Sequence, residues 1–312
     1  MLACQSKKIE RWIMDNKERQ TVVTIGFFDG VHQGHRFLIQ QVLEAARCDN
    51  LCSVVMTFDH HPREVLYPDA RMELLTTLDE KLALLEATGI DRVEVLPFTR
   101  EVSELSARDF MAQVLRDKLN ARKLILGYDN RFGKRSANET FEDYVAYGRE
   151  LGIEVVQAAM APQGAVSSSR VRRALVAGDV SAANLLLGYS YALTGTVVGG
   201  HQEGRKLGFP TANLRVAGSR KLIPASGVYG VRVSIDGADH VGMMNIGTRP
   251  TFNGHEKTLE VNIFDYQGDL YGRELTVVFS RRIRDERRFD SPELLAEQLL
   301  KDKEEALRCA NE

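Results

Sequence analysis

Strand-like segments alternate with helical ones between residues 21 and 159, and this alternation restricts the fold more than any other feature of the sequence. Apolar residues are continuous or alternating in the strand-like segments, whereas they recur roughly every three to four residues in the helical ones. The strand-like segments are 21–28, 51–58, 91–98, 122–128 and 153–159, and the helical segments are 34–48, 79–89, 106–119 and 140–152. Such alternation predicts a mainly parallel sheet with helices on both faces and ligands at the carboxyl ends of its strands.

The pattern changes near Leu187, where short strands with turn signals take over. Just before this point, the segment 167–188 predicts two short helices broken at Gly178. The later strand-like segments are 192–200, 227–247, 258–266 and 274–283. Asp236 and Gly237 interrupt the second of them and predict a hairpin turn.

A single helix is expected to close the chain. Ser291 is a suitable N-cap and Pro292 suits the first helical position. Many short strands and one helix predict a small antiparallel barrel or sandwich. We therefore expect two domains, residues 1–186 and residues 187–312, which agrees with the roughly 100–200 residues of a typical domain.

Composition narrows the class of protein. The chain has 312 residues, 44% of them hydrophobic, so each domain has enough apolar residues to form a hydrophobic core. Its net charge of −2 predicts no general electrostatic attraction to nucleic acid. No apolar run approaches about 18 residues and the N-terminus lacks a secretory core, so we expect no membrane span and a cytoplasmic protein. Four scattered cysteines are expected to be reduced thiols rather than zinc ligands.

The stretch "GFFDGVHQGH" begins at Gly26, where the first strand-like segment runs out. Gly26 and Gly30 let the backbone approach a ligand, and Gly34 opens a helix whose first amide groups point outward. His32 and His35 are three residues apart, so both reach over that helix end. This arrangement fits a site that binds a triphosphate and stabilises charge developing on it. The alternative is a polar turn followed by a helix start.

A second candidate site lies in "GRKLGFPTANL", which begins at Gly204. Thr211 and Asn213 are two residues apart and face the same side of an extended segment. Their hydroxyl and amide oxygens are suitable ligands for Mg²⁺, which also keeps waters and nucleotide phosphates. The alternative is a polar turn near a strand.

The segment "TLEVNIFDY" alternates so that Glu260 lies on the face opposite Val261. A carboxylate that faces the open end of the barrel is a suitable proton acceptor for a substrate alcohol. The alternative is a glutamate that faces only solvent.

Several motifs together resemble one family, the bacterial bifunctional riboflavin kinase/FAD synthetases. "GFFDGVHQGH" resembles the His-x-Gly-His signature of the nucleotidyltransferase superfamily in the form that this family uses. "TFDHHP", "LGYDNRFG" and "VSSSRVR" resemble its further motifs in the same order, and "GFPTAN" resembles its kinase motif. The resemblance covers about residues 21–306, and it implies an α/β nucleotidyltransferase-type (Rossmann-like) domain followed by a β-barrel domain with a C-terminal helix.

The resemblance implies roles for individual residues. His32, His35 and Arg172 would act on ATP in the first reaction, and Glu260 would be the base of the second domain. Nucleotide and phosphate contacts are implied for Gly26, Phe27, Asp29, Gly30, Gly34, Ser168, Ser169, Gly204 and Gly208. Flavin contacts are implied for Pro62, Asp129, Phe132, Arg284 and Phe289. Thr211 and Asn213 would hold Mg²⁺.

Three departures from the family pattern stand out. Ser169 replaces a usual threonine and keeps the hydroxyl. Asn262 occupies a position where many relatives have histidine. The loop after Gly133 lacks a glycine that commonly follows.

The family's chemistry implies two activities: conversion of riboflavin and ATP to FMN, and of FMN and ATP to FAD and pyrophosphate. The implied partners are riboflavin, FMN, FAD and ATP, with no nucleic acid or membrane, in a monomer or weak homo-oligomer. Three alternatives remain open: a kinase-only enzyme, a non-catalytic flavin- or nucleotide-binding protein with one degenerate site, and a fragment of an aminoacyl-tRNA synthetase that shares the histidine signature.

Overall fold

The computed structural model describes residues 19–67, 72–128, 131–134, 139–162, 164, 166–199, 208–216, 220–251 and 254–310. Two compact units divide the chain. The first comprises Met1–Met72 and Leu78–Val166, and the second comprises Glu73–Thr77 and Ser167–Glu312. Each unit is described separately.

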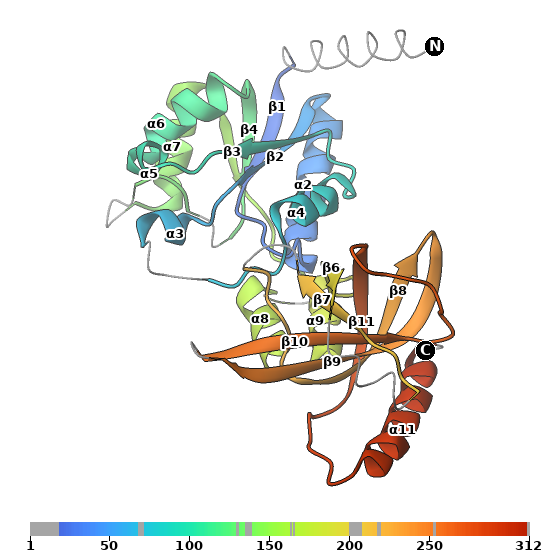
Figure 1. Ribbon diagram of the computed structural model, residues 1–312. Helices are drawn as coiled ribbons and strands as arrows, with labels where there is room; N and C mark the ends of the chain where they lie inside the picture. Colours follow the sequence, from blue (N-terminus) through green and yellow to red (C-terminus); the bar gives the residue numbers. More distant parts are fainter. Residues whose placement is uncertain are drawn as a thin grey trace. The chain divides into compact units, whose positions relative to one another are not determined.

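The first unit contains a five-stranded parallel sheet in the order β3-β2-β1-β4-β5 (Figure 1). Its strands are β1 (Thr21–Ile25), β2 (Cys52–Phe58), β3 (Arg92–Leu96), β4 (Ala121–Leu126) and β5 (Glu154–Gln157). The chain runs outward from β1 through β2 to β3 and then returns to the other side of β1 for β4. This reversal makes β1 and β4 the topological switch point of the sheet, and open parallel sheets bind ligands beyond the carboxyl ends of strands at such a point.

Helices cover both faces of this sheet (Figure 1). The helices α2 (Gln33–Asp49) and α4 (Leu78–Glu86) lie on one face, while α6 (Ala107–Phe110), the π-helical η1 (Met111–Arg116) and α7 (Phe141–Leu151) lie on the other. Neighbouring β1 residues point in opposite directions, so Val22 packs with Ile39 of α2 and Val23 packs with Val114 of η1. Two short helices that the sequence pattern did not predict are α3 (Pro62–Leu66) and α5 (Arg100–Glu104).

The second unit is built on a closed barrel in the order β10-β7-β6-β11-β8-β9. Its strands are β6 (Ala192–Val198), β7 (Ala212–Val216), β8 (Gly227–Ile235), β9 (Ala238–Thr251), β10 (Gly254–Ile263) and β11 (Glu274–Arg284), and its helices are α8 (Ser168–Val176), α9 (Val180–Leu187) and α11 (Pro292–Ala310). Tyr229 and Phe279 fill the core with an edge-to-face contact. The predicted fold class, a parallel-sheet domain followed by a barrel and a C-terminal helix, is confirmed.

Turn and cap predictions are also confirmed. Asp236 and Gly237 both have positive φ, 52° and 81°, as a type I′ hairpin turn requires. Gly178 has a φ of 81° between α8 and α9. The Ser291 hydroxyl accepts a hydrogen bond from the Leu294 amide at 3.4 Å, and α11 begins at Pro292.

The second unit also includes residues far from the barrel in sequence. Leu75 is fully buried in the same apolar cluster as Leu175 of α8 and Leu187 of α9. A parallel bridge joins Leu74 to Lys221, and the Lys221 ammonium donates to the Leu75 carbonyl at 2.8 Å. The division of the chain into compact units therefore falls after Val166. The boundary between the two functional domains, expected at residues 186–187, stays a prediction.

Candidate active sites

The loop that follows β1 has a strained backbone held in place by buried side chains. Phe28 and Val31 have positive φ, 54° and 37°, which is rare for a bulky or β-branched residue. Their side chains are 2% and 0% exposed, and the Arg36 guanidinium donates to the Val31 carbonyl at 3.1 Å. Gly30, between them, has a φ of 78°. Such strain persists only where the surrounding structure fixes it, and it is common at functional sites.

His32 is the N-cap of α2. Its Nδ1 accepts a hydrogen bond from the His35 amide at 3.2 Å, which places the proton of a neutral His32 ring on Nε2. The two imidazole rings stack with centroids 3.6 Å apart. A Cβ on Gly34 would lie 3.1 Å from the Val166 carbonyl oxygen and 3.2 Å from the His32 ring, so glycine permits this close packing. The predicted pairing of His32 with His35 at a helix N-terminus is present.

His35 carries a buried Nδ1 with no hydrogen-bond partner. Burial, followed by the nearby charges of His32 and Lys81, lowers the pKa of His35 well below its ordinary value. His35 is therefore neutral at pH 7. A neutral imidazole with an unused polar atom at a helix N-terminus is suited to a ligand that completes its hydrogen bonding.

The second motif meets this loop at the carboxyl end of β2. The Asp59 carboxylate accepts hydrogen bonds from the amides of His60 and Phe98, both at 2.8 Å. Burial alone would raise the pKa of Asp59, but these bonds and the His60 ring hold it below its usual range. The His61 ring lies edge-on to Phe27 with centroids 4.6 Å apart, next to Pro62 at the start of α3. Phe27 and Pro62, two of the predicted residues, are thus near one another.

Lys81 of α4 is a residue of this region that the sequence analysis missed. Its ammonium donates to the Phe58 carbonyl at 2.8 Å and lies 4.0 Å from the centre of the Phe27 ring. The residue is only 2% exposed. The available signal was its position four residues before the buried Leu85, because residues with that spacing share a helix face.

The third motif gives a mixed result. Asp129 lies outside the described residues. Phe132 packs between Phe110 and Tyr144 with centroid distances of 5.3 and 5.0 Å, and it is 9% exposed. Little of this ring is left for a ligand, so the structure gives Phe132 a place in the core, and its predicted flavin contact stays a prediction.

The serine-rich motif begins α8. Ser167 is its N-cap, and its hydroxyl accepts a hydrogen bond from the Arg170 amide at 3.4 Å. Ser168 and Ser169 occupy the first turn. The Arg172 guanidinium donates to the Glu73 carbonyl at 3.0 Å. These residues belong to the second unit and the histidine pair to the first, so their joint action on one nucleotide stays a prediction.

The candidate kinase site lies on two paired barrel strands. Glu260 of β10 is directly opposite Asn213 of β7, so their side chains share a face. The Thr211 hydroxyl donates to the Glu260 carboxylate at 3.4 Å. The predicted alternation is confirmed, because Leu259 and Val261 are buried in the barrel core while Glu260 lies on the other face.

Glu260 lines a cavity of about 770 Å³. Apolar side chains fill the barrel interior, so Glu260, at an alternate position of β10, points outward. The cavity is also lined by Leu295 and Leu299 of α11. Asn262, at the position of the expected histidine, is 6% exposed and donates to the Pro210 carbonyl at 2.6 Å.

Two predicted flavin-contacting residues line the same cavity. The Phe289 ring lies 5.6 Å from the Arg284 guanidinium carbon and 4.7 Å from that of Arg287. Arg284 also forms a bidentate ion pair with Asp302 of α11, which is 1% exposed. This pair ties the helix to the barrel beside the cavity.

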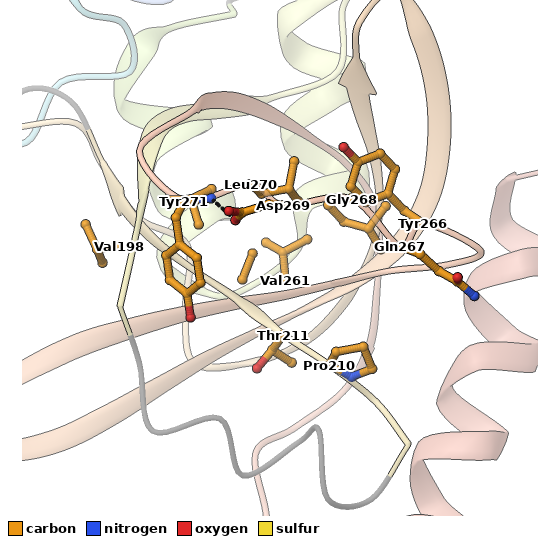
Figure 2. A pocket seen from close by; sticks show the side chains of 13 residues that line it. Val198, Pro210, Thr211, Val261, Tyr266, Gln267, Gly268, Asp269, Leu270 and Tyr271 are labelled. Atoms are coloured by element: carbon orange, nitrogen blue, oxygen red, sulfur yellow. Dashed lines mark hydrogen bonds between the residues drawn. The ribbon is translucent and has the colours of Figure 1, made fainter.

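A second cavity, of about 590 Å³, shares Thr211 with the first. Figure 2 shows Tyr266 and Tyr271 on either side of it, with Val261 and Leu270 between them. Gly208 has a φ of 80° just before this region, whereas Gly204 lies outside the described residues. Thr211 therefore lines both cavities.

The residues around Thr211 fit a hard cation. The atoms that the side chains of Thr211, Asn213 and Glu260 can offer to such a cation are oxygens. Oxygen ligands are those that magnesium prefers. Within the described ranges, no cluster of three or more His, Cys, Asp or Glu side chains is placed to hold a metal on its own.

The fold and the two sites define a two-domain class of transferase that uses nucleotides. A family model described as FAD synthetase matches residues 14–170, and one described as riboflavin kinase matches residues 187–310. The chain belongs to the bifunctional riboflavin kinase/FMN adenylyltransferase family, which confirms the resemblance seen in the motifs.

Curated relatives and a solved structure cover nearly the whole chain. A protein of Bacillus subtilis named bifunctional riboflavin kinase/FMN adenylyltransferase is 35% identical over 95% of this chain and 94% of its own length. One of the same name from Escherichia coli K12 is 40% identical over 90% of both. A crystal structure from Streptococcus pneumoniae, described as a macrolide-efflux protein, has a TM-score of 0.84 at 36% identity and covers 92% of this chain and 93% of that one. Among the residues described for this chain, no helix has the length and apolar character needed to cross a membrane.

Proposed function

We propose that this chain makes FAD from riboflavin in two ATP-dependent steps carried out at separate sites. The barrel phosphorylates riboflavin to FMN, and the parallel-sheet unit takes part in transferring AMP from ATP to FMN, releasing pyrophosphate. The observation that carries this proposal is that family models for both activities match the chain, while the histidine pair and the Thr211–Glu260 group lie in different compact units.

In the kinase step, Glu260 accepts the proton of the terminal ribityl hydroxyl of riboflavin. The hydroxyl oxygen then attacks the γ-phosphate of ATP, which forms FMN and ADP. The cavity beside α11 holds the flavin, with Phe289 and Arg284 along its wall, and the cavity beside Tyr266 and Tyr271 holds the nucleotide. Thr211, which lines both cavities, stands at the point of transfer.

Thr211 and Asn213 would hold Mg²⁺ in the kinase site. When bound, this ion supplies positive charge that offsets the negative charge on the transferring phosphate. The protein's own contribution is to keep these oxygen atoms on one face of paired strands next to Glu260.

In the adenylylation step, an FMN phosphate oxygen attacks the α-phosphate of ATP and pyrophosphate leaves. The FMN phosphate is already ionised near pH 7, so this step requires no protein base. Nε2–H of His32, neutral His35 and the first amides of α2 stabilise the phosphate charge.

Product analysis tests this assignment. Purified protein is incubated with riboflavin or FMN, ATP and Mg²⁺, and the flavins are separated by chromatography. Replacement of both His32 and His35 by alanine should abolish FAD formation and leave FMN formation intact. Glu260→Gln should lower FMN formation by roughly 10²- to 10⁴-fold, the usual contribution of a general base, and leave FAD formation from supplied FMN intact.

Loss of both activities in either folded variant would contradict the division between two sites. The proposal as a whole fails if the wild-type chain converts neither riboflavin nor FMN.

We propose that the protein acts in the cytoplasm as a monomer or weak homo-oligomer, with no nucleic acid or membrane partner.

A further inference from the structure

Lys81 occupies an unusual place for a lysine. Its ammonium group is buried between the carboxyl ends of two adjacent strands, hydrogen-bonded to the Phe58 carbonyl of β2 and positioned over the ring of Phe27, which follows β1. Lysine is almost never fully buried unless its charge is compensated. The two strand ends that it joins carry the first and second motifs of the adenylylation site.

Two carboxylates interact electrostatically with this ammonium. Asp29 is 3% exposed in the loop after β1, and Asp59 is half-buried after β2. Both raise the pKa of Lys81, as negative charges near an ammonium do. The site that contains them must nevertheless accept two anionic substrates, ATP and FMN. A fixed cation beneath the loop offsets the repulsion that these carboxylates would otherwise exert.

Maintaining this charge works against burial. Burial lowers the pKa of Lys81 to about 8, even though Asp29 and Asp59 oppose the change. The charged amine therefore predominates at pH 7 despite an unfavourable environment. Costly buried charges of this kind concentrate at functional sites.

We propose that Lys81 is a positioning residue for FAD formation, which fixes the ends of β1 and β2 and balances the charges of Asp29 and Asp59. It acts through Phe27 and Phe58 rather than by touching substrate, because it is 2% exposed. This inference rests on the proposed adenylylation activity.

The other charged groups near Lys81 are accounted for as follows. His35 of α2 is neutral at pH 7, and the Lys81 charge contributes to keeping it so. Asp79 and Glu80 precede Lys81 on α4 itself. In the alkaline range, carboxylates are already ionised and His35 is already neutral, so Lys81 is the group in this cluster whose charge changes near pH 8.

The test compares Lys81→Met, Lys81→Arg and, as a matched control, Lys118→Met at an exposed position of the same unit. Lys81→Met should lower kcat/KM for FAD formation by up to about 100-fold, because a small displacement of the groups that hold the substrates can cost on the order of 10²-fold in rate. Lys81→Arg, which keeps the charge, should recover most of that loss. FMN formation in the same samples should be unchanged, and circular dichroism should show folded protein.

A pH profile separates this role from a purely structural one. Wild-type kcat/KM for FAD formation should fall as pH rises through about 8, because the Lys81 ammonium loses its proton there. In Lys81→Arg this fall should be absent, since a guanidinium stays charged well above that range.

Two results would overturn the inference. One is a folded Lys81→Met variant whose kcat/KM for FAD formation equals that of the wild type. The other is a fall of kcat/KM at alkaline pH that is the same in the wild type and in Lys81→Arg. If Lys81→Met does not fold, the comparison of the wild-type and arginine profiles still decides. A wild-type chain that makes no FAD from FMN instead contradicts the proposed function, which keeps the two failures distinct.

Discussion

Individual residues in the first site show how local chemistry sets charge. His32 and His35 are both histidines, three positions apart, but their Nδ1 atoms differ. Nδ1 of His32 accepts a hydrogen bond from the His35 amide, whereas Nδ1 of His35 has no hydrogen-bond partner. Stacked at 3.6 Å, the two rings cannot both be protonated without strong repulsion. The neutral state of His35 therefore follows first from its burial and then from the charges of His32 and Lys81 nearby.

This state has a measurable effect on stability. Unfolded His35 takes up a proton below about pH 6.5, whereas the folded residue, with its lowered pKa, does not. The unfolded state thus binds more protons, and the free energy of unfolding falls as pH decreases below about 6.5. His35→Asn should reduce this fall between pH 7 and pH 5 by on the order of 1 kcal/mol, measured by urea unfolding followed by circular dichroism.

Gln40→Asn, at an exposed position of the same helix, provides the control. This variant should keep the wild-type dependence on pH, because it neither adds nor removes a titratable group. If His35→Asn has the same slope as wild type, the folded-state pKa of His35 is not depressed and the assignment of a neutral imidazole is wrong.

At the level of helices and strands, sequence periodicity predicted most elements, and local chemistry predicted where several begin and end. The hairpin at Asp236 and the start of α11 at Pro292 depend only on neighbouring residues, and both were predicted. Contacts between segments that are distant in the sequence were not predicted. Lys81 becomes part of a site only because α4 packs at the ends of β1 and β2, and Glu260 faces outward only because the barrel closes.

The attachment of α11 to the barrel is a specific element-level feature. Asp302, which is 1% exposed, receives a bidentate ion pair from Arg284 and a hydrogen bond from Gln298. Removing one partner leaves a poorly solvated charge, so Asp302→Asn should lower the free energy of unfolding by on the order of 3 kcal/mol. Because α11 lines the outer cavity, FMN formation should also fall, whereas FAD formation from supplied FMN should persist.

Glu304→Gln, on an exposed position of the same helix, is the matched control. It should leave both the unfolding midpoint and FMN formation near wild type. An Asp302→Asn variant as stable as the control would show that the ion pair contributes nothing net to holding α11.

For the whole molecule, the compact units and the family matches divide the chain at different places. The riboflavin kinase match begins at residue 187, but the barrel's apolar cluster also includes side chains from the two helices before it. These are Val171, Leu175, Val180, Ala183 and Leu187, each 0% exposed. A fragment that starts at residue 187 exposes the surface that four of these residues cover.

A comparison of two fragments tests whether these helices are part of the kinase fold. Each fully buried aliphatic side chain contributes roughly 1.5–3 kcal/mol, so residues 187–312 should melt at a markedly lower temperature than residues 167–312. Both fragments lack Leu75 and should be less stable than the full chain, because that residue is fully buried in the same cluster. FMN formation should follow stability, since Thr211 and Glu260 are present in each. Equal melting temperatures for the two fragments would mean that α8 and α9 are dispensable, and that the part of the chain that begins at residue 187 folds by itself.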